Sequence, residues 1–277
     1  MPGRAGNGHS AVARARQCAT LSAVPEPLHI LVFGQSNSAG AVLPGGALPW
    51  PQLLAAALPG ALGRPATVTF RTFYAHAAGS AAYLDRELAK YSPDLVILTM
   101  TPFAFLQPMV GPGVRKRYGE RAYRLYQRLE SRFDRVTRDR GEAAGSANRL
   151  ARRMTRAVLG AAPVADYEAV RDATVAALRR VAREEDLRVL AFQGFVRVPE
   201  GSARSRRAAA SLLERFFVDV RAACGQAHCD YINLNEAHRE DLDRWFYPDR
   251  LHVTAEAHAL TANAVLQWVV KAASPPA

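Results

Sequence analysis

LHILVFGQSNSAG, residues 28–40, joins an apolar run of strand length to a turn rich in small residues. Ser36 falls on this turn, just beyond the carboxyl end of the predicted strand. In open α/β sheets, ligands bind outside the carboxyl ends of the strands. A serine at this point can face a crevice, with its backbone amide near the start of the following helix. A turn that only joins a strand to a helix is the alternative interpretation, because such short motifs also arise by chance.

Further along the chain, strand patterns alternate with helical patterns. The run at 93–101 is almost continuously apolar, which is typical of a parallel strand covered on both faces. The other strand patterns lie at 66–74, 187–193 and 229–234. Helical patterns occupy 53–62, 81–90, 167–185, the stretch from Ser202 or Ser205 to Cys224, and 255–271. Five strands that alternate with helices predict a three-layer α/β fold with a doubly wound parallel sheet.

Turn and capping residues refine these boundaries. Pro59-Gly60 is expected to end or interrupt the first of these helices, and Thr254 to cap the last one. The stretches 102–112 and 235–247 are predicted as loops, the first apolar and the second polar. The last helix is expected to bury one stripe of side chains, made by Ala257, Leu260, Ala264 and Trp268.

Length and composition restrict the class of protein. The 277 residues are 49% hydrophobic and 22% charged, which suits one large domain and excludes global disorder. We expect this domain at 27–277, after a disordered basic leader at 1–26 that lacks the apolar core of a secretory signal. No apolar run is long enough to predict a membrane span. Three irregularly spaced cysteines argue against a disulfide scaffold or a zinc site and favour unpaired thiols in a cytoplasmic protein.

Residues 113–160 form a basic insertion that carries most of the net charge of +11, with fourteen Arg or Lys against five Asp or Glu. Helical spacing predicts a long amphipathic helix, a break near Gly141–Gly145 and a second basic helix at 147–159. The insertion presents either a solvated face or a lid or docking surface for an anionic group. Arg115, at its start, suits a phosphate or carboxylate. Nucleic-acid binding is not expected, because the aromatics fall on the apolar stripe and no nucleic-acid module is visible.

Asp249 and His252 lie three residues apart, just before the predicted last helix. Nucleophilic catalysis needs a hydroxyl, a base within hydrogen-bond reach and a group that orients the base. Ser36 would supply the hydroxyl. His252 would take its proton and return it to the leaving group, while Asp249 would hold the imidazole tautomer. This chemistry needs no metal or organic cofactor, but it requires the fold to bring the two ends of the chain together.

Gly34-Gln35-Ser36-Asn37 after an apolar strand, together with Asp249-x-x-His252 before a terminal helix, resembles the SGNH (GDSL-type) hydrolase superfamily. The form with Gln and Asn around the serine is similar to carbohydrate O-acetylesterases, including sialate esterases. The resemblance covers residues 28–270 except the basic insertion, and it implies a flavodoxin-like fold and an acyl-enzyme mechanism. It also implies that Gly79, in a turn of small residues after the second strand, donates its backbone amide to the oxyanion hole.

The chain departs from the family where the pattern puts a Gly at Thr101 and an oxyanion-hole Asn at Phe103. Losing one donor of such a hole typically lowers turnover by about 10²–10³-fold. Three explanations are open. The amides of Ser36 and Gly79 suffice, with or without help from Asn37; a group from the insertion, such as an Arg, replaces the missing Asn; or the protein no longer hydrolyses esters.

These features predict a serine hydrolase or acyltransferase that acts on an ester or thioester. The resemblance implies an acetyl group on a sugar. The apolar residues at 103–110 and the basic insertion favour instead a larger acyl chain or a phosphate-bearing carrier, such as coenzyme A or an acyl carrier protein. Core packing is the alternative role for that apolar stretch. The alternative function is a non-hydrolytic binding protein on the same scaffold that uses the basic insertion.

Two further histidines lie close in sequence to the predicted site. His76 precedes the Gly79 turn and either lines the crevice or is an ordinary core or surface histidine. His258 lies one and a half helical turns beyond His252 and is therefore expected to have a structural role.

Overall fold

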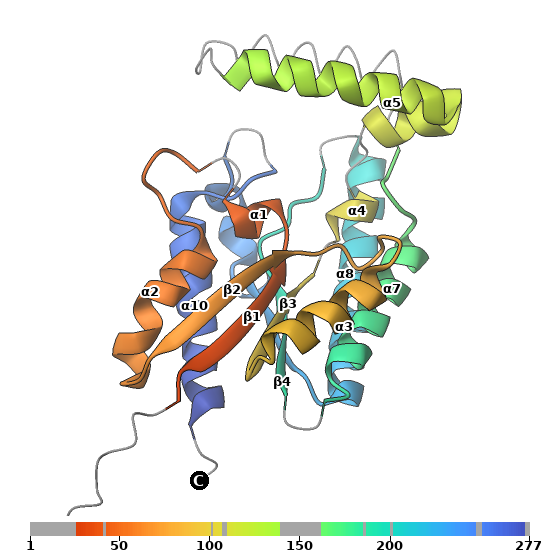
Figure 1. Ribbon diagram of the computed structural model, residues 1–277. Helices are drawn as coiled ribbons and strands as arrows, with labels where there is room; N and C mark the ends of the chain where they lie inside the picture. Colours follow the sequence, from red (N-terminus) through yellow and green to blue (C-terminus); the bar gives the residue numbers. More distant parts are fainter. Residues whose placement is uncertain are drawn as a thin grey trace, which may run out of the picture.

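The protein folds around one five-stranded parallel sheet, seen in a computed structural model (Figure 1). The structure describes residues 26–40, 43–100, 102–106, 110–138 (backbone only from 130), 162–184, 187–199, 202–247 and 251–274. The strands are β1 (Leu28–Gly34), β2 (Ala66–Thr72), β3 (Leu95–Thr99), β4 (Arg188–Gln193) and β5 (Asp230–Asn233). All four pairings are parallel, in the order β2-β1-β3-β4-β5. The predicted α/β class and strand number are confirmed.

Helices cover both faces of the sheet. The longer ones are α2 (Trp50–Leu62), α3 (Ser80–Tyr91), α5 (Val110–Arg138), α7 (Tyr167–Val181), α8 (Ala203–Ala227) and α10 (Ala255–Ala273). The short ones are α1 (Ser36–Ala39), α4 (Phe103–Leu106), α9 (Leu234–Ala237) and the 3₁₀ helix η1 (Arg239–Trp245). In Figure 1, α2 and α10 lie on one face of the sheet, and α3, α7 and α8 lie on the other. This is the predicted three-layer arrangement.

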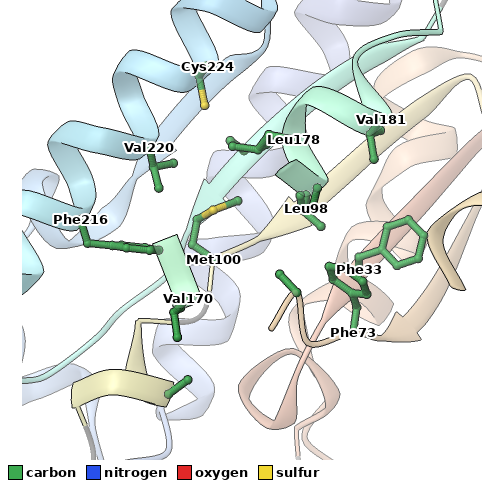
Figure 2. Packing of buried hydrophobic residues seen from close by; sticks show 14 of the residues in the cluster. Phe33, Phe73, Leu98, Met100, Val170, Leu178, Val181, Phe216, Val220 and Cys224 are labelled. Carbon is green, nitrogen blue, oxygen red and sulfur yellow. The ribbon is translucent and has the colours of Figure 1, made fainter. Parts of the chain in front are cut away.

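The core has two halves because the central strands are buried on both faces. Leu31 and Phe33 of β1 belong to the half beneath α3, α7 and α8, together with Leu98 (Figure 2). Ile30 and Val32 point the opposite way, into the half beneath α2 and α10. Successive side chains of a strand face opposite sides, so an unbroken apolar run fills both halves. This explains why β1 and β3 show no polar alternation.

The strand order places a ligand-binding crevice between β1 and β3. The chain adds β2 on one side of β1 and then β3 on the other, so the winding direction reverses there. In a sheet of this order the crevice opens outside the carboxyl ends of the strands at that reversal. β1 ends at Gly34 and β3 at Thr99. Any side chain just after either strand therefore lies at the edge where ligands bind.

Two predicted loops and one predicted helix end need correction. The helix α2 continues through Pro59 to Leu62, because a proline in the last turn removes only one hydrogen bond and Gly63, at φ 63°, caps the helix. The apolar stretch after β3 contains α4, and Phe105 and Leu106 are buried in the core, so core packing is its role there. The polar stretch after β5 contains α9 and η1, since Asn233 Oδ1 caps the first of these helices.

The last helix begins as predicted, and it buries Ala257 and Trp268 of the predicted stripe as part of a wider face. Thr254 Oγ1 accepts the Ala257 N–H at 3.3 Å, which confirms the cap. Leu260 and Ala264 of the predicted stripe are only half-buried. The fully buried residues are Ala257, His258, Thr261, Ala262, Val265, Trp268, Val269 and Ala272. The helix packs against α2 as well as the sheet, and this second contact turns and widens its buried face.

The basic insertion begins with α5, which lies beyond the carboxyl end of the sheet in Figure 1. The predicted amphipathic helix is confirmed, although it starts at Val110 and contains a kink at Gly119, with φ 83° and ψ 178°. Only glycine adopts that backbone conformation readily. The predicted break at Gly141–Gly145, the second basic helix and the leader up to residue 25 lie outside the described residues. In the part of the chain that is described, no helix is both long and apolar enough to cross a membrane.

Candidate active site

A small pocket of about 60 Å³ opens at the carboxyl edge of the sheet. Ser36 reaches it from the turn after β1, Thr99 from the end of β3 and Gln193 from the end of β4. The described residues of the lining are Gln35, Ser36, Asn37, Ser38, Trp50, Thr99, Met100, Phe103, Phe192, Gln193, Gly194, Phe195, Val196, Val253 and Thr261. None of these side chains is ionisable at neutral pH. The described lining is therefore neutral, and the pocket lies where the strand order predicts a ligand site.

The turn that carries Ser36 is packed tightly onto the sheet. A Cβ on Gly34 would lie 2.6 Å from Ser38 Oγ and 2.9 Å from Phe70 Cε2, so only glycine fits beneath the turn. Gln35 Nε2 donates to the Phe73 carbonyl at 3.3 Å and ties the end of β1 to the chain after β2. At the far side of α1, Gly40 adopts φ 68° and donates its N–H to the Ser36 carbonyl. The position of Ser36 is fixed from both sides.

The segment that carries His252 lies against this turn. Asn37 Nδ2 donates to the Leu251 carbonyl at 3.2 Å, although 214 positions separate the two residues. Val253, on the other side of His252, lines the same pocket as Ser36. The Tyr247 N–H donates to the His252 carbonyl at 2.9 Å, and Phe246 pairs with Val253 in an antiparallel bridge. The structure thus brings together the two segments that carry the predicted nucleophile and the predicted base.

Asp249 belongs to the same loop but lies outside the described residues. Tyr247, just before the gap, donates its backbone N–H to the carbonyl of His252, the second residue after the gap. Whether the Asp249 carboxylate orients the His252 imidazole therefore stays a prediction.

Gly79 does not line the pocket. It is exposed, adopts φ 76° and immediately precedes α3. No carbonyl or side chain among the described residues accepts its N–H, whereas its carbonyl accepts the Tyr83 N–H at 3.0 Å. An amide without a protein partner is available to a ligand, so the oxyanion role of Gly79 also stays a prediction.

Phe103 and Arg115 have different surroundings. Phe103 is half-buried at the start of α4 and lines the pocket, so an apolar ring stands where the family pattern has an Asn. Arg115 is exposed on α5, where its Nε lies 2.8 Å from Glu120 Oε2 and its guanidinium lies over the Tyr123 ring. Arg115 is not part of the pocket lining. Among the described residues, no arginine of the insertion takes the place of the missing Asn.

The pocket contains one buried polar side chain that the sequence analysis missed. Gln193 is 1% exposed and lines the pocket at the end of β4. Its Nε2 donates to the Gly194 carbonyl at 2.8 Å, and its buried Oε1 has no partner among the described residues. The sequence signal for Gln193 was a polar residue at the end of the apolar run in β4.

Asn235 was missed as well, and it holds one wall of the pocket. Its Oδ1 accepts the Val196 N–H at 2.8 Å, and its Nδ2 donates to the Val196 carbonyl at 2.7 Å. One side chain therefore replaces the neighbouring strand that this stretch of backbone lacks. Phe195, next to Val196, stacks on Trp245 with ring centroids 5.4 Å apart.

His258 supports the opposite wall, which confirms its expected structural role. It is 2% exposed, and its Nδ1 accepts the Trp50 N–H at 3.2 Å. Burial lowers the pKa of His258 to about 4, so the imidazole is neutral near pH 7. Because Pro49 offers no capping side chain, His258 supplies the acceptor at the start of α2. Trp50 itself lines the pocket.

His76 and the two described cysteines do not line the pocket. His76 lies edge-on to Tyr74, is half-buried and does not line the pocket, and burial lowers its pKa. Its Nδ1 has no partner among the described residues. Cys224 and Cys229 are free thiols whose pKa values burial raises to about 12 and about 11. Within the described ranges, no group of three or more His, Cys, Asp or Glu side chains could hold a metal ion.

Solved structures of esterases and lipases resemble this fold. A lipase/acylhydrolase from Enterococcus faecalis aligns over 90% of this chain and 99% of its own, with a TM-score of 0.54 and 13% identity. The chain has the same α/β fold as this enzyme. LAE5, an alpha/beta hydrolase enzyme from the metagenome of Lake Arreo, aligns over 90% of this chain and 97% of its own chain. Its TM-score is 0.51 and its identity 13%.

The acetylxylan esterase Axe2 from Geobacillus stearothermophilus also gives a TM-score of 0.51, at 10% identity, over 88% of this chain and 94% of its own. No family model and no curated protein matches the sequence. At these identities the likeness establishes the fold, and the activity has to be argued from the pocket.

Proposed function

We propose that the protein is a serine hydrolase or acyltransferase that acts on an ester or thioester, with Ser36 as nucleophile and His252 as base. The observation that carries this proposal is the hydrogen bond from Asn37 to the Leu251 carbonyl. It joins the residue after the serine to the residue before the histidine, at the mouth of a pocket that Ser36 lines. Esterases and lipases with the same fold support the same class of reaction.

The reaction proceeds through an acyl-enzyme. Ser36 Oγ attacks the carbonyl carbon of the substrate while its proton passes to His252, and the carbonyl π electrons move onto oxygen. Collapse of this tetrahedral intermediate breaks the bond to the leaving group, which takes the proton from His252. Water or another acceptor then repeats the sequence and releases the acyl group from Ser36. Asp249 fits the role of the group that orients the imidazole throughout.

Backbone amides are the candidate donors for the oxyanion. The Ser36 N–H lies in the first turn of α1, where no preceding helical carbonyl is available to accept it. The Gly79 N–H likewise has no partner among the described residues. We infer that these two amides serve as the oxyanion hole and that Phe103 contributes an apolar wall instead of a third donor. The expected cost is slower turnover than a three-donor hole gives, by about 10²–10³-fold.

The pocket favours a short, uncharged acyl group. About 60 Å³ holds only a few non-hydrogen atoms, and none of the described side chains that line the space is ionisable. Among the solved structures with this fold, Axe2 is an acetylxylan esterase, which fits a short acyl group.

We further infer that α5 is a docking face for an acidic carrier of the acyl group. Between residues 115 and 128, six exposed side chains are Arg or Lys and one is Glu. Leu125 and Leu129 are 60% and 57% exposed on the same helix. Cations beside exposed aliphatic side chains suit a protein partner with acidic and apolar groups, such as an acyl carrier protein. Coenzyme A, which has no apolar face of that size, is the competing outcome.

Activity-based labelling tests the central proposal. A fluorophosphonate probe should modify Ser36 in the wild-type protein, and the label should disappear in Ser36→Ala and fall strongly in His252→Ala. Ser205→Ala, at an exposed serine of α8, should be labelled like the wild type. Hydrolysis of p-nitrophenyl esters should be fastest for acyl groups of two to four carbons. If Ser36 stays unlabelled and no ester is hydrolysed, the scaffold is a binding protein and the enzyme proposal fails.

A further inference from the structure

We propose that Gln193 Oε1 recognises a hydroxyl group on the acyl portion of the substrate, so that the protein acts on short hydroxyacyl esters. This inference rests on the proposed function, because it assumes that the acyl group attached to Ser36 enters the pocket. It adds a specificity-determining residue from β4, a strand that contributes none of the predicted catalytic groups.

The first argument is the unused acceptor on a buried side chain. Gln193 is 1% exposed, and its Oε1 has no partner among the described residues. The amide cannot simply be turned round, because Nε2 donates to the Gly194 carbonyl at 2.8 Å and an oxygen there would face another oxygen. A buried acceptor without a partner is unfavourable, and most such groups in folded proteins are satisfied. A ligand that donates a hydrogen bond would remove this penalty.

The second argument is the position of Gln193 relative to Ser36. Only β3 lies between β1 and β4, so the two strand ends are about two strand spacings, or roughly 10 Å, apart. Both residues line one small pocket, together with Thr99 at the end of β3, the strand that lies between β1 and β4. A two- or three-carbon acyl group on Ser36 spans part of that distance, and the Gln193 side chain spans the rest. The Gln193 side chain is therefore within reach of a hydroxyl on C2 or C3 of the acyl chain.

The third argument is the chemistry of the remaining lining. Gln35 Nε2 donates a hydrogen bond to the Phe73 carbonyl, and Asn37 Nδ2 donates one to the Leu251 carbonyl. Among the described residues that line the pocket there is neither a carboxylate nor a cation, so a charged substituent on the acyl group would find no counter-ion among them. A neutral hydroxyl matches a neutral amide oxygen in a pocket that Phe192, Phe195 and Val253 also line.

Isosteric ester pairs test the proposal. Hydroxyacetyl and propionyl p-nitrophenyl esters differ by OH against CH₃, and 3-hydroxypropionyl and butyryl esters differ in the same way one carbon further out. Each kcat/KM is divided by the rate constant for hydroxide-catalysed hydrolysis of the same ester, which removes intrinsic reactivity. We expect the wild type to prefer the hydroxylated member of at least one pair by about 10-fold or more, because a site that hydrogen-bonds a hydroxyl rejects its apolar isostere. Gln193→Leu should reduce that ratio to near one.

The matched control is Gln52→Leu, which replaces an exposed glutamine of α2 and should keep the wild-type ratio. Melting temperatures show whether Gln193→Leu folds, and Gln193→Met provides a second apolar replacement. Equal rates for both members of each pair in the wild type would overturn the proposal while leaving ester hydrolysis by Ser36 intact.

A binding experiment separates this proposal from the proposed function. In the Ser36→Ala protein, glycolamide and propionamide present the same isosteric difference without any reaction, and NMR titration measures their relative affinities. Tighter binding of glycolamide that disappears in the Ser36→Ala, Gln193→Leu double variant supports the Gln193 subsite even if no ester is turned over. Equal affinities for the two amides overturn it.

Discussion

Acid should destabilise the fold through His258, the buried imidazole that accepts the Trp50 N–H. Burial lowers the pKa of this group from 6.5 to about 4, so between these values the unfolded chain binds a proton that the folded chain excludes. The contribution of neutral His258 to the free energy of unfolding is fully present above pH 6.5 and is lost as the pH falls towards 4. The perturbation to compare with the wild type is His258→Asn, whose Oδ1 can occupy the acceptor position of Nδ1 but does not titrate.

The size of the effect follows from the two pKa values. Each pH unit between them changes the free energy of unfolding by up to about 1.4 kcal/mol. At pH 4.5 the wild type should therefore have lost roughly 2 to 3 kcal/mol through this one group. That is a large fraction of the total stability of a typical domain, which is about 5–15 kcal/mol.

Urea denaturation at pH 7.0, 6.0, 5.0 and 4.5, followed by circular dichroism, measures this contribution. Other groups titrate in both proteins and cancel in the comparison. His258→Asn should be less stable than the wild type at pH 7, because the ring leaves a cavity, and the difference should shrink by roughly 2 to 3 kcal/mol at pH 4.5. A difference that stays constant across this pH range would refute the assignment of a neutral, buried acceptor to His258.

Three further outcomes follow from contacts around the pocket. Gly34→Ala forces a Cβ against Ser38 and Phe70 and should lower stability by about 1–3 kcal/mol, whereas Gly60→Ala, where nothing lies within 4 Å, should raise the melting temperature. Asn37→Ala removes the bond to the Leu251 carbonyl, so kcat should fall by roughly 10-fold or more with a stability change near 1 kcal/mol; a wild-type kcat would contradict a positioning role. A double variant of α5, Arg121→Glu with Arg124→Glu, should lower kcat/KM for carrier-bound thioesters by about 10-fold at low salt. The control is a double variant of α8, Arg204→Glu with Arg207→Glu, which should leave this kcat/KM unchanged. Hydrolysis of p-nitrophenyl esters should be unchanged in the α5 variant, and equal effects on carrier and coenzyme A thioesters would count against a protein partner.

The sheet could be predicted because its local signals agree with its tertiary environment. The runs that form β1 and β3 are apolar on both faces, and helices cover both faces in the structure. The turn that carries Ser36 could also be recognised, because Gly34 and Gly40 are required there for space and for a positive φ. The meeting of this turn with the His252 segment was predicted from the chemistry of a catalytic triad and from the resemblance to the SGNH hydrolases, since nothing in the local sequence of either one encodes the other.

Other features depend on contacts that no local pattern carries. The buried face of α10 includes its packing against α2, so the periodicity of α10 alone identified Ala257 and Trp268 but missed the rest of that face. Gln193 closes a strand, and a polar residue there is as consistent with solvent exposure as with a pocket. Asn235 acts through the backbone of Val196, a contact 39 positions away that only the folded chain creates.

The cap on α2 has a consequence for how the protein is made. The first turn of α2, near the beginning of the polypeptide, is completed by an imidazole from α10, near its end. During synthesis on the ribosome, the first turn of α2 therefore cannot be completed until α10 has emerged. A nascent chain that stops before α10 contains Ser36 but lacks the acceptor that completes the first turn of α2 beside it.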